Sequence, residues 1–144
     1  MKQRKLFIAI TCVTLCGGYI LANSSEYFGA AFITQSDAAK KWGAKEFNPL
    51  EFKNASEADK AAMAVDAIKK KSFVGQKMTA VREKMGDPDS YFFSDTIYAY
   101  KITNQKNSTD EAWHLVFIPD KDLDKVAEVK IHKKCCYPVP PWAK

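Results

Sequence analysis

The 144-residue chain has few histidines and lacks the common sequence motifs of catalytic sites. It has two histidines, His114 and His132, no glycine-rich phosphate-binding loop and no Gly-x-Ser-x-Gly motif of the kind that holds a hydrolase nucleophile. A catalytic site needs an activated nucleophile or several titratable side chains that converge. We therefore expect a protein that binds a partner without catalysing a reaction, and we expect no cofactor.

An excess of charge of one sign is also lacking. The chain has 22 Lys and Arg against 17 Asp and Glu, but Lys2, Arg4 and Lys5 lie at its start, which leaves 19 basic against 17 acidic residues elsewhere. Nucleic-acid-binding domains gather Lys and Arg on one face, whereas here acidic residues alternate with the lysines. We therefore expect no nucleic-acid partner.

The strongest compositional feature is the run 6–22, which has no charged residue and follows the basic start of the chain. Its length lies between the apolar core of a signal peptide and a short membrane span. Residues 1–24 are predicted to be either a signal peptide cleaved near Ser24 or an uncleaved hydrophobic anchor helix. We expect a periplasmic protein, tethered to the inner membrane or secreted. Cys12 and Cys16 lack the preceding residues typical of a lipid-modified cysteine.

Residues 25–44 are predicted to be a linker with a short helix from Ser36, and residues 45–134 a single domain. The domain opens with an extended lead-in of apolar residues around Pro49, namely Phe47, Leu50 and Phe52. Asn54 and Glu57 have capping-box spacing, and apolar residues then recur at helical spacing from Ala58 to Ile68.

A second helix is expected to begin after Gly75 and to end at Gly86-Asp87-Pro88, because glycine adopts positive φ and proline cannot continue a helix. The apolar period then changes to two. Strands are predicted at 95–102, 112–118 and 126–132.

The middle strand is apolar on both faces, so it is expected at the centre of the sheet, with His114 packed and hydrogen-bonded within it. The last strand alternates, with His132 on its polar face, so it is expected to be an edge with His132 exposed. The predicted fold class is α+β: two helices packed on a three-stranded antiparallel meander, a two-layer sandwich preceded by the N-terminal hydrophobic helix.

The stretch from Gly75 to Pro88 resembles the signature of the BamE (SmpA/OmlA) family. It has a glycine before the second helix, Val81 six residues on, and an ending in Met85-Gly86-Asp87-Pro88. The segments that follow are similar in register to the family's strands. These segments are Ile97–Tyr100, Leu115–Phe117 with the turn at Asp120, and a last strand from Val126. The resemblance covers residues 45–134.

The resemblance implies a fold shared with β-lactamase-inhibitor proteins and a protein-binding role in outer-membrane or envelope assembly. The chain differs from the family at Lys77, where the family places a Ser or Thr helix cap, and it lacks the family's lipid-attachment motif. Fold alone does not determine function. A secreted inhibitor-type binding protein, released after cleavage near Ser24, is the alternative.

We select three aromatic residues after the Gly-Asp-Pro turn as the patch that contacts an envelope protein, and we expect them to be exposed: Tyr91, Phe92 and Phe93.

Cys135 and Cys136 raise a third hypothesis, a thiol or metal-binding protein. A disulfide between neighbouring cysteines is strained, so they form intermolecular disulfides, stay reduced, or bind a soft metal with His132. These residues supply three ligands and a structural zinc site takes four, so we expect no metal site. The Pro-rich tail, 135–144, is predicted to be an extended strut on the domain or a docking peptide.

Overall fold

The computed structural model describes residues 32–92, 94–104, 112–133 and 137–138. Within these ranges, no helix has the length and hydropathy that crossing a membrane requires. The predicted signal peptide or anchor, 1–24, lies outside them, and so do Phe93, Cys135 and Cys136.

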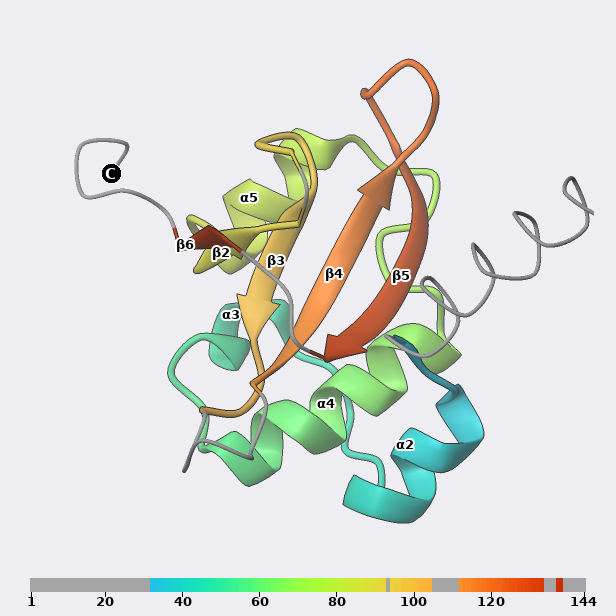
Figure 1. Ribbon diagram of the computed structural model, residues 1–144, viewed down its shortest axis with the longest axis vertical. Coiled ribbons are helices and arrows are strands. Elements are labelled where there is room, and N and C mark those ends of the chain that lie inside the picture. The colour runs from blue at the N-terminus through green and yellow to red at the C-terminus, as the bar shows by residue number, and fades with distance from the viewer. Residues whose placement is uncertain (1–31, 93, 105–111, 134–136, 139–144) are drawn as a thin grey trace, which may run out of the picture. The chain divides into compact units, whose positions relative to one another are not determined.

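An antiparallel sheet forms one layer of the domain (Figure 1). The order of its six described strands is β1-β5-β4-β3-β2-β6. Because β3, β4 and β5 are neighbours in chain order, the predicted meander is confirmed, and three two-residue strands extend it on both sides. The strands are β1 Phe32–Ile33, β2 Ser90–Tyr91, β3 Tyr98–Lys101, β4 Trp113–Pro119, β5 Val126–Lys133 and β6 Tyr137–Pro138.

Four helices lie among the described residues and pack against one face of the sheet, behind it in Figure 1. The two predicted helices are α4 and α5, so the α+β class is confirmed while the numbers of helices and strands are larger than expected. The helices are α2 Gln35–Trp42, α3 Pro49–Phe52, α4 Glu57–Lys69 and α5 Met78–Met85.

The linker prediction for 25–44 is wrong over its described part, 32–44. Phe32 pairs with His132 of β5, and α2 packs on α4 with Ala38 fully buried. The short helix expected from Ser36 is present, and the side chain of Thr34 caps it by accepting the N–H of Asp37. Because segment 32–44 is largely polar, its sequence did not indicate that it belongs to the domain.

The lead-in is not extended around Pro49. The side chain of Asn48 accepts the N–H of Leu50, and Pro49 favours the first helical position, so α3 forms there. Phe52 is buried as expected, whereas Leu50 points away and is 73% exposed.

The main core lies between the helices and the sheet. Phe52, Val65 and Val81 from the helices meet Tyr100, Leu115, Phe117 and Ile131 from the strands. On α4, Ala58 is exposed while Met63, Ala64 and Ala67 are buried. The buried surface of α4 is wider than its sequence pattern predicts, because α2, α3 and β5 all contact this helix.

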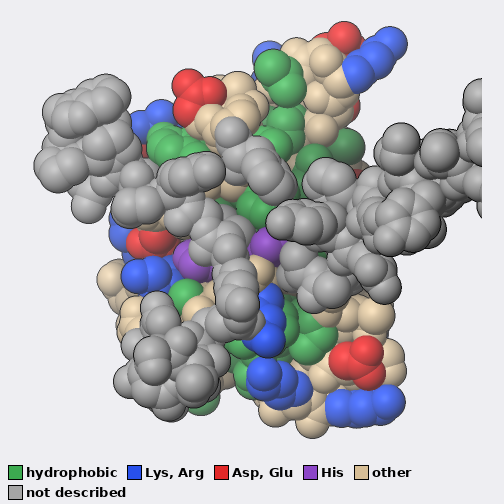
Figure 2. Space-filling view, in the orientation of Figure 1, with side chains coloured by type: hydrophobic (Ala, Val, Ile, Leu, Met, Phe, Trp, Pro, Cys, Tyr) green, Lys and Arg blue, Asp and Glu red, His purple; other side chains and the backbone are tan. Residues whose placement is uncertain are grey.

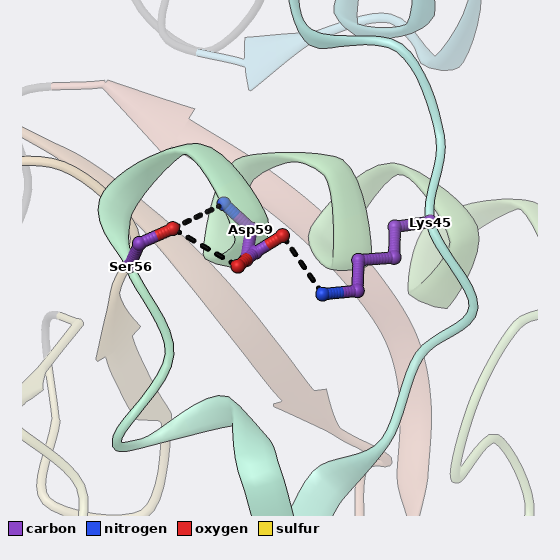
Figure 3. A network of polar contacts seen from close by, with 3 residues as sticks. All are labelled: Lys45, Ser56 and Asp59. Carbon is purple, nitrogen blue, oxygen red and sulfur yellow. Dashed lines mark hydrogen bonds and ion pairs between the residues drawn. The ribbon is translucent and has the colours of Figure 1, made fainter.

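The cap of α4 is Ser56, two residues after the predicted Asn54 (Figure 3). Its hydroxyl accepts the N–H of Asp59 at 3.1 Å and donates to the Asp59 carboxylate at 3.0 Å. The ammonium of Lys45 lies 2.8 Å from the same carboxylate. The Lys45 ammonium and the Ser56 hydroxyl hold the pKa of Asp59 below its ordinary value. This network ties the lead-in to the start of α4.

The start of α5 gives a first prediction. Lys77 occupies the cap position with the extended backbone of an N-cap, but its side chain makes no capping hydrogen bond. Lys77→Ser should stabilise the domain by about 1 kcal/mol, because a hydroxyl there can accept a free N–H of the first turn. Ser56→Ala, which removes an existing cap, should destabilise it by a similar amount. Urea unfolding measures both, and an unchanged midpoint for Lys77→Ser would contradict the capping argument.

Candidate functional site

The face of the sheet that points away from the helices carries the most unusual group of side chains. Side chains alternate along a strand, so Leu115 and Phe117 of β4 face the helices while His114 and Val116 face the other way. We call this surface the second face. Figure 2 shows histidine among hydrophobic and lysine side chains there. The second face comprises Phe32, Ser90, Phe92, Ile97, Ala99, His114, Val116, Ile118 and His132.

Two phenylalanine rings pack against His132. The centroids of Phe32 and Phe92 lie 4.6 and 4.5 Å from that of the imidazole, and 5.9 Å from each other. Phe92 follows β2, so its ring reaches His132 on β5 by crossing β3 and β4. Ala99 and Val116 lie beneath it in the same cluster, and the small side chain of Ala99 leaves room for the ring.

The predicted contact patch is therefore wrong at Phe92, which is 7% exposed and turned onto the second face. Tyr91 is half-buried and lies beside Tyr98, with the ring centroids 6.2 Å apart. Phe93 lies outside the described residues. Ser90 and Phe92 share the second face because side chains alternate along β2 and the residue after it, and β2 is too short for this alternation to be recognised in the sequence.

The two histidines lie directly opposite each other on β4 and β5. The packed position expected for His114 is confirmed, since it is 4% exposed. His132 was expected at an exposed edge, but it is 7% exposed. That prediction is wrong because β1 pairs beyond β5, so β5 is an interior strand, and because Phe32 and Phe92 pack on the ring.

Three buried polar atoms of the described residues have no hydrogen-bond partner, and all three belong to the second face: Ser90 Oγ, His114 Nδ1 and His132 Nδ1. The hydrogen bond expected for His114 is therefore missing at Nδ1. Most buried polar side chains in proteins are hydrogen-bonded, and one that is not calls for a specific explanation.

Burial lowers the pKa of His114 and of His132 to about 4, because the charged imidazolium loses its hydration. Lys101, opposite His114 on β3, lowers the His114 pKa further, and Asp89 partly offsets this. Both imidazoles are therefore neutral at pH 7 and able to accept a hydrogen bond or a metal ion through nitrogen.

A second candidate surface lies at one end of the sheet, where the α4–α5 loop meets the β4–β5 turn (Figure 1). We call residues 70–77 and 120–125 the loop tip. Backbone hydrogen bonds tie each segment to the residue that follows the other: Gly75 N to Val126 O at 2.8 Å, and Met78 N to Asp124 O at 2.7 Å.

The loop tip exposes apolar side chains. Among the described residues the exposed large hydrophobics are Leu50, Val74 and Leu123, and two of these three lie in the loop tip. The sequence analysis placed only a turn at Asp120 in this part of the chain. An apolar residue between two acidic ones, Leu123 between Asp122 and Asp124, was the sequence signal that could have indicated an exposed apolar side chain here.

No family model, no curated protein and no solved structure matches this chain. The resemblance to the BamE family therefore stays a prediction that depends on the residues from Gly75 to Val126. Among the residues that the structure describes, no group of three or more His, Cys, Asp and Glu side chains is placed to hold a metal ion.

The buried histidines predict a pH dependence. Their pKa values are lowered in the folded state, so the unfolded chain binds more protons between pH 6.5 and pH 4. The free energy of unfolding should therefore fall as the pH drops through this range, by up to about 3 kcal/mol for each imidazole. Asp59 and Asp66 have lowered pKa values, so their contribution is lost only at still lower pH.

Urea unfolding at several pH values, with a chelator present, measures this effect. His114→Leu and His132→Leu each remove one titrating group and should each flatten the profile. A free energy of unfolding that stayed constant from pH 6.5 to pH 4 would show that the imidazoles are not buried in the neutral form.

Proposed function

We propose that this chain is a cell-envelope protein without catalytic activity, whose α+β domain binds a protein partner through the loop tip. The observation that carries the proposal is the pair of exposed apolar side chains there, Val74 at 39% and Leu123 at 54% exposure.

The backbone of the loop tip supports this proposal. The described non-glycine residues with positive φ are Lys71, Phe73 and Leu123, and all three lie in it. Such conformations cost of order 1–3 kcal/mol each and concentrate at functional sites. For Phe73 the cost is offset, because its ring is buried against Phe47 and Phe117. Leu123 has no comparable burial, so contact with a partner is a reason for a leucine at that position.

Charged residues of both signs flank Val74 and Leu123 along the two segments of the loop tip. A small apolar centre inside a polar rim is the usual composition of an interface between proteins that also exist apart. The exposed charged residues of the loop tip are Lys70, Lys71, Lys77, Lys121, Asp122, Asp124 and Lys125.

The location and the kind of partner come from the sequence. Residues 1–24 favour a periplasmic domain, tethered to the inner membrane or secreted. The order of α4, α5 and the meander is the order that the resemblance to the BamE family implies. An accessory role in envelope or outer-membrane assembly is therefore the function we propose.

Crosslinking tests the contact surface. A photoreactive residue at Val74 should yield a specific adduct with an envelope protein in native membranes. Leu123→Asp should lower the adduct about tenfold or more, because loss of a central hot-spot contact costs about 2 kcal/mol or more. The matched control is Leu50→Asp, which changes a more exposed leucine outside the loop tip and should leave the adduct unchanged. An equal loss in both variants, or no protein adduct at all, would overturn the proposal.

The envelope location has a separate test. Alkaline phosphatase fused after Lys144 should be active, because this enzyme needs the disulfides that form outside the cytoplasm. If the alkaline phosphatase fusion were inactive, and a fusion to a reporter that works only in the cytosol were active, the envelope assignment would be wrong. Mass spectrometry of the N-terminus then distinguishes a tethered chain from one cleaved near Ser24, which the inhibitor-type alternative requires.

A further inference from the structure

His132 on the second face is covered by two aromatic rings that come from outside the meander. The ring centroids of Phe32 and Phe92 lie 4.6 and 4.5 Å from that of the imidazole, and His132 is 7% exposed. Its Nδ1 atom has no hydrogen-bond partner among the described residues. The covered position therefore suits a neutral imidazole, because an imidazolium there would lose its hydration and gain little in return.

The charged groups that face this position do not compensate an imidazolium. On β5, Glu128 is paired with Lys130, and the Lys130 ammonium also lies 4.9 Å from the Phe32 ring centroid. Among the described residues no carboxylate raises the pKa of His132, and burial alone lowers it to about 4. The other titratable groups on this face act on His114 rather than on His132, and they are Lys101 of β3 and Asp89, which precedes β2.

Phe32 belongs to a strand with few attachments. β1 is two residues long, lies outside β5 and pairs with it only through Phe32 with His132 and Ile33 with Ile131. The next element, α2, is held separately, because it packs on α4 through a fully buried Ala38. Releasing β1 therefore disrupts far fewer contacts than unfolding the main core, and such segments open locally at the lowest free energy.

We infer that the second face is an acid-sensitive switch, in which a proton on His132 releases Phe32 and β1 from β5 while the helices and the meander stay folded. The open state binds the proton more tightly than the covered state, so each unit fall in pH from 6.5 to about 4 favours opening by up to about tenfold. Opening returns water to the imidazolium and exposes the apolar cluster of the second face. The loop tip is not involved, since it lies at the other end of β5.

Amide hydrogen exchange of the purified full-length chain tests the switch, with each rate corrected for the direct effect of pH on exchange. Protection of the amides that join β1 to β5 should fall roughly 100-fold between pH 6.5 and pH 4. Amides of α4 and β4 should stay protected. An equal loss of protection in β1, α4 and β4 would show that acid unfolds the whole domain, and it would overturn the inference.

Two histidine variants form a matched pair. His132→Leu replaces the titrating group with an apolar side chain, so β1 should keep its protection at pH 4. His114→Leu also removes a buried imidazole from the second face, but it leaves His132 in place and should open as the wild type does. Identical behaviour of the two variants would contradict the assignment of the switch to His132. Circular dichroism at pH 7 establishes that each variant is folded.

A measurement on the unmodified chain covers the case in which His132→Leu fails to fold. The chain has two histidines, so imidazole ¹⁵N resonances report the protonation of each one. One imidazole should gain its proton with the same pH midpoint at which β1 loses protection. Protonation of both imidazoles while β1 stays protected would overturn the inference.

Phe32→Ala tests the cover itself. It removes one of the two rings that pack on His132, so the imidazole should take up its proton at a higher pH, closer to 6.5. An unchanged midpoint would show that Phe32 does not control this protonation. The same variant should leave the crosslink from Val74 unchanged at pH 7, so this inference and the proposed function can fail independently.

Discussion

The structure depends on β4 being covered on both of its faces. Leu115 and Phe117 pack against the helices, and His114 and Val116 are equally buried on the second face. A two-layer sandwich ordinarily leaves the outer face of its sheet polar and wet. Here Phe32 and Phe92 reach over that face from β1 and from the end of β2, so the domain has a second apolar cluster outside its main core.

This second cluster imposes a chemical constraint on the histidines. An imidazole in apolar surroundings keeps its neutral form and loses the water that would satisfy its nitrogens. His132 is held by aromatic rings on two sides, and Ala99 is small enough for one of those rings to cross the sheet. The same packing that stabilises the sheet therefore leaves the Nδ1 atom of each imidazole without a hydrogen-bond partner among the described residues.

The two candidate surfaces differ in their exposure to solvent and lie on different elements. The second face is buried and made of strand side chains, so its geometry is set by sheet register. The loop tip is exposed, and backbone hydrogen bonds between the α4–α5 loop and β5 hold it in place. Buried Phe73 links the loop tip to the main core, because its ring contacts Phe117 of β4. The loop tip is thus packed against the same strand that carries His114.

The sequence by itself determined the α+β class, helices α4 and α5, and the meander of β3, β4 and β5. Each of these has a regular apolar period or a local stop signal such as Gly86 before Pro88. Only the tertiary structure decided that 32–44 joins the domain, that Phe92 turns inward and that His132 is buried. These outcomes come from contacts between segments far apart in the chain, such as Phe32 with His132, and two-residue strands such as β1 and β2 are too short to show a period. Long-range pairing leaves no pattern in the local sequence, which is why these residues could not be predicted from it.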